Sequence, residues 1–176
     1  MYPLIRFLTT SIHSTMLKPI ELDGVCETSL RCMPWDMDMF LEMNNGRVLT
    51  LCDIGRFSLA IRTGLTKALR VNRWGLVVAG STVRYRKRVR IFDKITMRTQ
   101  VVAYDERWFY IVQSMWVKGQ PTSSVLIRTG VTSKGKVIPT NKVLKALGVT
   151  HFTFETSEWV NSWISSEEKR PWPPSS

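Results

Sequence analysis

Histidine is scarce in this chain, and the usual metal and nucleophile motifs are missing. The two histidines, His13 and His151, stand in no G-x-S-x-G elbow. The three cysteines, Cys26, Cys32 and Cys52, lack the paired spacing of a zinc site or a redox C-x-x-C. No glycine-rich phosphate loop is present either. We therefore expect no metal site and no redox cofactor, and a mechanism that needs no histidine.

Long apolar runs are also lacking. Near the start, Arg6 interrupts the apolar residues and hydroxyl residues dilute the rest, so neither a secretory signal nor a membrane span is predicted there, and none appears elsewhere. The odd number of cysteines is typical of reduced core residues in an intracellular protein, which predicts a cytoplasmic location. The first 18 residues hold Arg6 and Lys18 but no acid, so an organelle transit peptide is the alternative to a frayed or helical lead.

Acidic residues are few compared with basic ones. The chain has 25 Lys and Arg against 14 Asp and Glu, a formal charge of +11. This excess favours anionic partners such as nucleic acid, anionic lipid or a phosphate-bearing cofactor, although a simple surplus of surface Lys and Arg explains it equally well. No RNP-like motif, zinc finger or helix-turn-helix signature is present, so no nucleic-acid partner is expected.

The first half of the chain predicts a strand, a loop and a long helix. A chain of 176 residues with 44% hydrophobic residues suits one domain with one sizeable core. Residues 25–33 have the pattern of a strand that Pro34 ends. Asn44 and Asn45 are good N-cap residues for a helix that runs to Gly64. Its apolar residues spread over more than one face, so we expect this helix to be largely buried.

After Trp74 the hydrophobic period changes to two and stays so until about Val137. Breaks at 92–93, 105–106, 119–121 and 134–135 predict four strands joined by short turns, and short turns imply antiparallel neighbours. In the strand from Lys94 to Tyr104, apolar and polar residues alternate, which indicates a sheet with one buried face.

The C-terminal part predicts two short helices and a tail. Thr140 is expected to cap a helix that Gly148 ends. A small amphipathic stripe follows, made by Trp159, Val160, Trp163 and Ile164. The tail from Glu167 is expected to be disordered. The chain thus divides into an N-terminal lead (1–22), a main domain (23–150) and a C-terminal amphipathic helix with a disordered tail (151–176).

Together these elements predict an α+β protein of the hotdog type, with a five-stranded, mainly antiparallel sheet wrapped around one long central helix. A single helix covers one face of such a sheet incompletely, and a sheet has exposed edges. We therefore expect a homodimer or homotetramer.

The stretch from Asp36 to Arg47, DMDMFLEMNNGR, carries the most specific signal. It resembles the D-x-D-x-x-x-H-x-N-N-x-R pattern of the 4-hydroxybenzoyl-CoA thioesterase family of hotdog proteins, and the similarity runs from about Val25 to Gly148. The resemblance implies an acyl-CoA thioesterase that releases a free acid and coenzyme A, with coenzyme A needed only as part of the substrate.

In that family the second acid of D-x-D is the catalytic carboxylate, which is Asp38 here. An aspartate just before a helix can attack a thioester or activate water, while backbone N–H groups at the helix N-terminus polarise the carbonyl. Asn45 would supply such a backbone donor. The side chain of Asn44 either contacts the substrate or caps the helix. Without the resemblance, an acid that stabilises the helix dipole is the simpler interpretation of Asp38.

The chain departs from the family pattern at two positions. Glu42 stands where the motif has histidine, and Leu41 replaces a frequent glycine. A carboxylate at position 42 would raise the pKa of Asp38 if the two came close. In a second branch of hotdog thioesterases the carboxylate lies inside the central helix, and there Asp53 competes with Asp38. The alternative for Asp53 is an ion pair with Arg56 at helical spacing.

Five of the seven residues from Arg84 to Arg90 are Lys or Arg. On a strand, Arg84, Arg86, Arg88 and Arg90 would share one face and form a cationic ladder. Such a ladder suits the phosphates of coenzyme A through bidentate hydrogen bonds. A solvated strand face that discourages edge pairing is the alternative.

Two other functions compete with thioester hydrolysis. The missing histidine of the motif favours a non-catalytic acyl-CoA-binding or scaffolding protein, because folds host many functions. The positive charge leaves a basic RNA-associated or membrane-associated protein as a third option.

Overall fold

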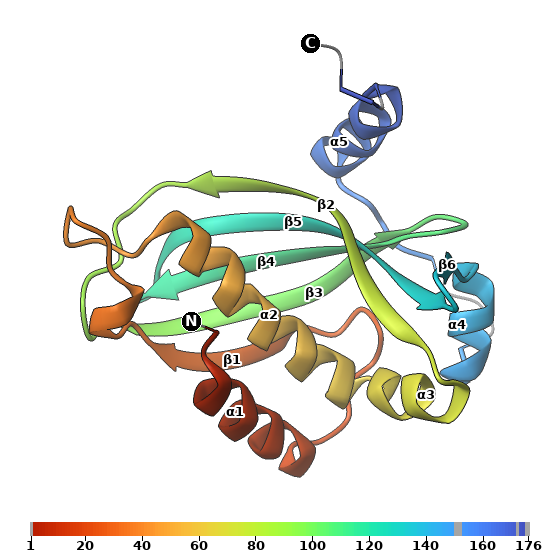
Figure 1. Ribbon diagram of the computed structural model, residues 1–176, viewed down its shortest axis with the longest axis horizontal. Helices are drawn as coiled ribbons and strands as arrows, with labels where there is room; N and C mark the ends of the chain where they lie inside the picture. The colour runs from red at the N-terminus through yellow and green to blue at the C-terminus, as the bar shows by residue number, and fades with distance from the viewer. Residues whose placement is uncertain (1, 150–152, 172, 175–176) are drawn as a thin grey trace.

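A curled antiparallel sheet wraps around one long helix, α2, in the computed structural model, which describes residues 2–149, 153–171 and 173–174 (Figure 1). The helices are α1 (Leu4–Met16), the 3-10 turn η1 (Pro34–Asp36), α2 (Asn45–Arg62), α3 (Leu65–Asn72), α4 (Thr140–Ala146) and α5 (Glu158–Lys169). The strands are β1 (Cys26–Arg31), β2 (Gly75–Tyr85), β3 (Lys94–Tyr104), β4 (Phe109–Val117), β5 (Gln120–Ser133) and β6 (Lys136–Val137). The predicted architecture is confirmed, with β6 as a short sixth strand.

The strand order is β1-β3-β4-β5-β2, and β6 pairs with β5. All pairings are antiparallel, as expected. The expectation that consecutive strands are neighbours is wrong at one point: β2 pairs with β5, and the chain then crosses to the other side of the sheet before β3 begins. Helices α2 and α3 connect β1 to β2, and β2 forms the edge of the sheet opposite β1, where it pairs with β5.

The ends of α2 follow from local sequence. The Asn44 side chain accepts a hydrogen bond from Gly46 N at 2.9 Å and so caps the helix, as predicted. Gly64 follows the last turn with a φ of 79°, a conformation that favours glycine. In the middle, Gly55 allows a close approach to the sheet, because an added Cβ would lie 2.5 Å from Met97 Sδ and 2.7 Å from Thr99 Oγ1. The helix is largely buried, as its apolar pattern predicts.

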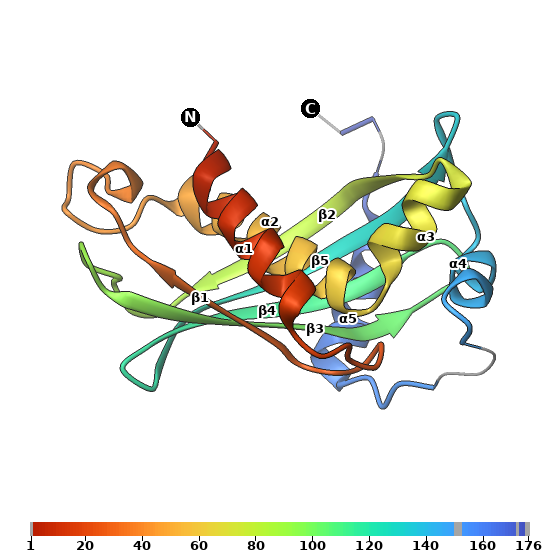
Figure 2. The same ribbon diagram turned by 90° about the horizontal axis from the view of Figure 1, so that it is seen from below.

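The N-terminal lead is helical and packs on α2 (Figure 2). Ser14 and Ser58 share a buried hydrogen bond of 2.7 Å between their hydroxyls. The ring centroids of Phe7 and Phe57 lie 4.6 Å apart. Helix α1 therefore covers the outer side of α2, and Arg6 in its first turn reaches Asp36.

The sheet has apolar side chains on both faces. Most of the core lies between α2 and the sheet. A smaller cluster on the opposite face includes Tyr110 and Leu126, and Val160 of α5 packs against it. Figure 2 shows α5 on the side of the sheet away from α1 and α2. The prediction of one buried face is confirmed along β3, where buried and less buried residues alternate, whereas parts of β4 and β5 are buried on both faces.

Two expectations about the C-terminal part are wrong in detail. Thr140 is the first residue of α4 and Pro139 occupies the cap position; the Thr140 hydroxyl donates to Asp105 O instead. Disorder was expected from Glu167, yet α5 continues to Lys169, and Glu167 forms an ion pair with Arg128 at 3.7 Å. The expected boundary between residues 150 and 151 lies outside the described residues, as does His151.

Candidate active site

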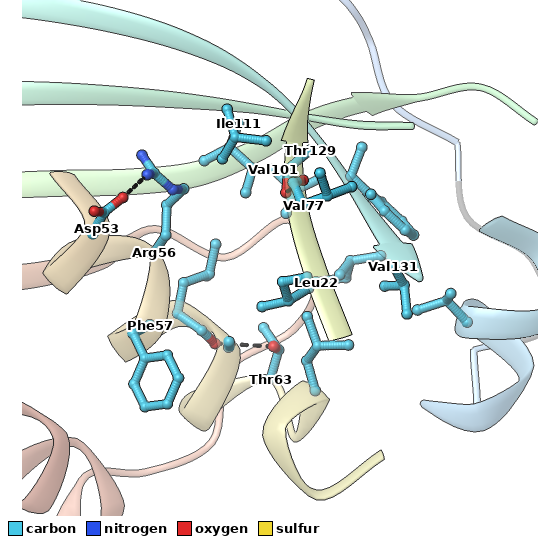
Figure 3. Close-up of a pocket in the computed structure, with 18 of the residues that line it drawn as sticks. Leu22, Asp53, Arg56, Phe57, Thr63, Val77, Val101, Ile111, Thr129 and Val131 are labelled. Carbon is cyan, nitrogen blue, oxygen red and sulfur yellow. Dashed lines mark hydrogen bonds and ion pairs between the residues drawn. The ribbon is translucent and has the colours of Figure 1, made fainter. Parts of the chain in front are cut away.

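A cavity of about 230 Å³ lies between α2 and the part of the sheet where β2 and β4 begin (Figure 3). Its walls are mainly aliphatic and aromatic, and they come from helices α1 to α4, strands β2 to β5 and adjoining residues. The lining includes Leu22, Phe57, Leu59, Ala60, Leu65, Leu76, Val78, Val101, Phe109, Ile111, Val131, Val143 and Leu147. A partly open, mainly apolar space of this kind suits a hydrocarbon group.

One end of the cavity is charged. Asp53 and Arg56, one helical turn apart on α2, form an ion pair there (Figure 3). The Asp53 side chain is 43% exposed and the Arg56 side chain 14%, so water reaches the carboxylate while the guanidinium is mostly enclosed. Burial raises the pKa of Asp53 above its ordinary value of 3.8, and the neighbouring Arg56 offsets part of that rise. The predicted pair of Asp53 with Arg56 is confirmed.

A buried glutamine on the sheet holds Arg56 in place. Gln113 is fully buried on β4, and its Oε1 accepts a hydrogen bond from Arg56 Nη1 at 2.7 Å. Gln113 Nε2 in turn donates to Cys52 O at 2.9 Å and to Thr99 Oγ1 at 3.0 Å. Sequence analysis missed this residue. Its signal was a polar side chain in phase with the buried Ile111 and Met115 of the same strand.

A second depression, a groove of about 460 Å³, lies at the N-terminus of α2. Its lining includes Met37, Asn44, Gly46, Arg47 and Thr50. Tyr2 lines both this groove and the apolar cavity, so the two spaces have a wall residue in common.

Asp38 lies in a tight turn before α2. Its Oδ1 accepts hydrogen bonds from Phe40 N at 2.8 Å and from Glu42 N at 3.4 Å, and Asp38 N donates to Glu42 O at 2.9 Å. The turn places Leu41 at a φ of 57°. Asp38 is half-buried and lines neither the apolar cavity nor the groove, although its neighbour Met37 lines the groove. Within one chain, the structure does not bring Asp38 and Asp53 together.

The two asparagines have different surroundings. Asn44 caps α2 and lines the groove, so the structure is compatible with both of its predicted roles. Asn45 is the first residue of α2, and its carbonyl accepts a hydrogen bond from the Tyr85 hydroxyl at 3.3 Å. The end of β2 therefore lies beside the N-terminus of the central helix.

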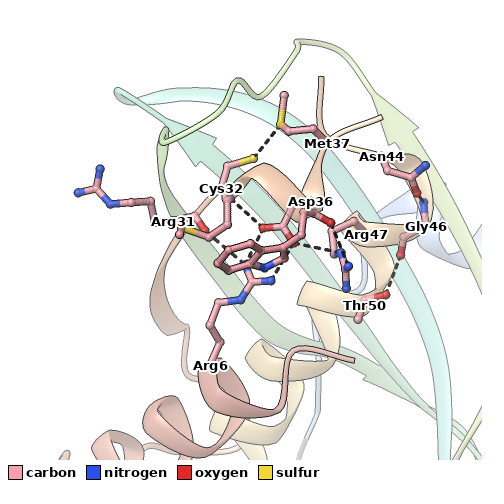
Figure 4. Close-up of polar contacts among 11 residues, drawn as sticks. Arg6, Arg31, Cys32, Asp36, Met37, Asn44, Gly46, Arg47 and Thr50 are labelled. Atoms are coloured by element: carbon pink, nitrogen blue, oxygen red, sulfur yellow. Dashed lines mark hydrogen bonds and ion pairs between the residues drawn. The ribbon is translucent and has the colours of Figure 1, made fainter. Parts of the chain in front are cut away.

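Asp36, the first acid of the D-x-D motif, lies in a cluster of ion pairs (Figure 4). Asp36 is fully buried and forms ion pairs with Arg6 of α1 at 2.7 Å and with Arg47 of α2 at 3.0 Å. Met33 N donates to its Oδ2 at 2.9 Å. One carboxylate thus joins α1, η1 and α2. Its partner Arg6 is 27 to 41 positions away from Met33, Asp36 and Arg47 in sequence, so no local pattern indicated this ion pair.

The cationic ladder predicted from Arg84 to Arg90 is not formed. Strand β2 ends at Tyr85, because Arg86 N and Lys87 N both donate to Thr122 O, at 2.8 and 3.1 Å, and the chain then leaves the sheet. Of the predicted binding residues, Arg84 is on the strand, whereas Arg86 and Arg88 belong to an exposed loop.

Two contacts hold this loop against the turn before α2. Val89 is buried in the core, and its carbonyl accepts a hydrogen bond from Met43 N at 3.0 Å. Arg88 pairs with Glu42 at 2.9 Å, so the carboxylate of Glu42 faces an arginine. The loop therefore runs beside the turn that precedes α2.

Within residues 2–149, 153–171 and 173–174, no group of three or more His, Cys, Asp and Glu side chains is placed to hold a metal ion. None of the helices in those same ranges has the length and apolar character needed to cross a membrane.

Curated relatives resemble a large part of the chain. Protein THEM6 from Danio rerio is 39% identical over 111 residues, which are 62% of this chain and 54% of that protein. Protein THEM6 from Xenopus laevis is 36% identical over 99 residues, 55% of this chain and 48% of that protein. The chain thus spans about half the length of these two relatives. Protein THEM6 from Drosophila melanogaster is 31% identical over 140 residues, 78% of this chain and 70% of that protein.

Solved structures share the fold. The YbaW probable thioesterase from Escherichia coli has a TM-score of 0.64 and 16% identity, covering 69% of this chain and 96% of that one. A 1,4-dihydroxy-2-naphthoyl-CoA thioesterase from Synechocystis has a TM-score of 0.61 and 11% identity, covering 70% of this chain and 95% of that one. The thioesterase-like superfamily itself matches residues 32–164. The resemblance first carried by the D-x-D motif is confirmed: the chain belongs to the thioesterase-like superfamily of hotdog proteins.

Proposed function

We propose that this protein hydrolyses acyl thioesters of coenzyme A to a free acid and coenzyme A, without a metal or redox cofactor. One observation carries the proposal: in a member of the thioesterase-like superfamily, an apolar cavity ends at the Asp53–Arg56 pair of the central helix. The cavity would hold the acyl group and place its thioester carbonyl beside a carboxylate that water can reach.

In the proposed mechanism Asp53 acts as general base. A water molecule attacks the thioester carbonyl carbon and gives its proton to the Asp53 carboxylate. The C–S bond of the tetrahedral intermediate then breaks, and the proton passes to the departing thiolate. The Arg56 guanidinium stabilises the negative charge that develops on the carbonyl oxygen. The raised pKa of Asp53 supports this role, because a carboxylate with a higher pKa is a stronger base.

Asp38 is the competing carboxylate, and the family motif supports it. Because Asp38 lines neither the cavity nor the groove of its own chain, its participation requires that its turn face the cavity of a second copy. Asn45 would then contribute a backbone N–H at the helix N-terminus, as the motif implies.

The coenzyme A portion is proposed to lie over the groove at the N-terminus of α2. The contact between Tyr85 and Asn45 brings the end of β2 there, and the exposed Arg84, Arg86 and Arg88 follow on the same segment. They would meet the phosphates as a basic loop, without the strand geometry first expected. Charge reversal at Arg86 and Arg88 together is expected to raise KM for acyl-CoA and weaken its salt dependence, whereas an unchanged KM across a salt series would remove them from the site.

The working form is proposed to be a homodimer or homotetramer. Strand β2 is at an edge of the sheet, and Leu76 and Val78 on it are 46% and 50% exposed while also lining the cavity. A second copy placed along this edge would pair the open strand and close the cavity wall. Three buried, unpaired cysteines support the cytoplasm as the proposed compartment.

A non-catalytic acyl-CoA-binding protein is the second candidate. It is favoured by Glu42, which replaces the histidine of the motif and is occupied by an ion pair with Arg88. This candidate predicts the same ligand without release of thiol.

Thiol release from a panel of acyl-CoA esters tests the proposal. Asp53→Asn is expected to lower kcat by about a hundredfold or more, as the loss of a general base does. The matched control is Asp23→Asn, which changes an exposed aspartate that is not itself part of the cavity lining. If Asp38→Asn is the more damaging change, the catalytic carboxylate is the one that the motif implies. Binding of acyl-CoA by the wild type without any thiol release would establish the non-catalytic candidate.

A further inference from the structure

The two threonines that line the cavity have no hydroxyl proton free to donate to a ligand. Thr63 Oγ1 donates to Leu59 O at 2.9 Å, and Thr129 Oγ1 donates to Val77 O at 2.8 Å. Both threonines line the cavity beyond the Asp53–Arg56 pair, and the surrounding side chains are apolar (Figure 3). The hydrogen-bond donors of the site are therefore concentrated at its charged end.

We propose that this cavity selects linear, unsubstituted alkyl acyl groups and discriminates against acyl groups that carry a hydroxyl or carboxylate at their far end. The inference rests on the proposed thioester site and names its substrate class. A polar substituent pushed past Arg56 would lose its water and find apolar walls, and a buried polar group without a partner is strongly unfavourable. A methylene in the same place is favourable.

The path along α2 limits the length of the acyl chain. The helix lines the cavity from Asp53 to Thr63, and these ten residues of rise span about 15 Å, close to an extended chain of about twelve carbons. Helices α3 and α4 lie at that end of α2 (Figure 1), where Leu65 and Leu147 complete the lining. Ala60 is 4% exposed and lies between the two ends, so a larger side chain there would shorten the path.

A chain-length series of saturated acyl-CoA esters measures the first part of the inference. We expect kcat/KM to rise by about fourfold for each added methylene, the gain from burying one CH₂ group, and to level off near twelve carbons. A flat series would overturn the inference, because the acyl chain would then lie outside the cavity.

Paired substrates that differ by one polar group measure the second part. Benzoyl-CoA is compared with 4-hydroxybenzoyl-CoA, and octanoyl-CoA with its ω-carboxy counterpart. In each pair the unsubstituted ester is expected to have a kcat/KM at least about tenfold higher, because a hydroxyl or carboxylate would be buried without a partner. Equal rates, or a preference for the substituted ester, would refute the proposed selectivity while leaving thioester hydrolysis intact.

Two cavity variants should shift the preferred length in opposite directions. Ala60→Leu is expected to lower kcat/KM for dodecanoyl-CoA by at least about tenfold while leaving butanoyl-CoA within about twofold of wild type, because two to three methylenes lose their space. Leu147→Ala is expected to extend the preferred length. The matched controls are Ala103→Leu and Leu126→Ala, which alter buried residues on the opposite face of the sheet. If the controls shift the length preference equally, the effect is one of general packing and the inference fails.

Fatty-acid binding gives a readout that does not depend on catalysis. Saturated fatty acids of four to sixteen carbons compete with a fluorescent fatty acid for binding to the 176-residue chain. Affinity should follow the same length dependence, and Ala60→Leu should shift it in the same direction. If the protein binds fatty acids in this way but releases no thiol, the proposed hydrolysis fails and the acyl cavity stands. If it hydrolyses esters but shows no length-dependent binding, the cavity is not the acyl site.

Discussion

Gln113 on β4 accepts a hydrogen bond from Arg56 on α2 at 2.7 Å, so the sheet fixes the guanidinium that pairs with Asp53. Gln113 is fully buried and does not belong to the cavity lining, which makes it a positioning residue. Without it, Arg56 would be free to turn away from the charged end of the cavity.

Gln113→Met should remove this positioning while nearly conserving side-chain volume. We expect kcat to fall by about tenfold with little change in KM, because ground-state binding of the acyl chain is unaffected. Gln113→Glu retains Oε1 as an acceptor for Arg56 and should preserve more of the activity than Gln113→Met, while it loses the two hydrogen bonds that Nε2 donates and is therefore less stable than the wild type. Equal kcat values for Gln113→Met and the wild type would show that Gln113 has only a structural role.

The acid limb of the pH profile should report Asp53. Because the base must be ionised, activity is present above its pKa and is lost as the pH falls through it. Burial raises that pKa above 3.8, so the midpoint of the limb should lie above this value. Arg56 lowers the pKa, and Arg56→Gln should therefore move the midpoint upward. Arg98→Gln, which removes an exposed partner of Glu27, serves as the control and should leave it unchanged. If the midpoint is the same in Arg56→Gln and in the wild type, the group that titrates is another carboxylate.

Asp36 should contribute strongly to stability and little to chemistry. Asp36→Asn removes the buried charge that faces Arg6 and Arg47, and we expect a loss of about 3 kcal/mol in the free energy of unfolding, measured by urea denaturation. Glu27→Gln breaks the exposed pair with Arg98 and should change stability by less than about 1 kcal/mol. Comparable losses in the two variants would mean that the Asp36 cluster does not anchor α1.

Assembly should depend on the β2 edge. The wild type is expected to sediment as a dimer or tetramer of the 20.3 kDa chain, and Val78→Lys should shift it toward monomer by placing a charge on the open strand. Val25→Lys places the same charge just before β1, at the opposite edge, where Val25 is also exposed. Dissociation by Val25→Lys in place of Val78→Lys would move the interface to that edge. An active monomer would contradict a shared site altogether.

The cysteines should be unreactive in the native protein. Burial raises the pKa of Cys52 to about 12 and that of Cys32 to about 11, and all three thiols are buried. At pH 8 the thiolate fraction of Cys32 is therefore about one in a thousand, so a disulfide reagent should label the native protein very slowly. All three should react at once in concentrated guanidinium chloride. Rapid labelling of a thiol before unfolding would show that the core opens locally.

The elements themselves could be predicted because their signals are local. Asn44 caps α2 by accepting a hydrogen bond from the backbone N–H of Gly46, two residues further along the chain. Gly64 follows the end of the helix with a positive φ. The alternation from Lys94 to Tyr104 shows which side of the strand is buried, whatever its partners are. The D-x-D stretch also identified the superfamily, since a motif is contiguous in sequence.

Pairing and placement depended on contacts between distant residues. The four alternating arginines from Arg84 to Arg90 have the pattern of a strand, yet the hydrogen bonds to Thr122 O end β2 at Tyr85, and the rest of the basic run is a loop. No pattern near Asp38 or Asp53 tells which of the two lines a cavity, because the cavity walls come from strands and helices far apart along the chain. Arg56 and Gln113 are 57 positions apart, and only the packing of α2 against β4 brings them within hydrogen-bond distance. The amino-acid sequence by itself determined the helix caps, the strand pattern and the family, whereas the tertiary structure alone decided which carboxylate meets the apolar cavity.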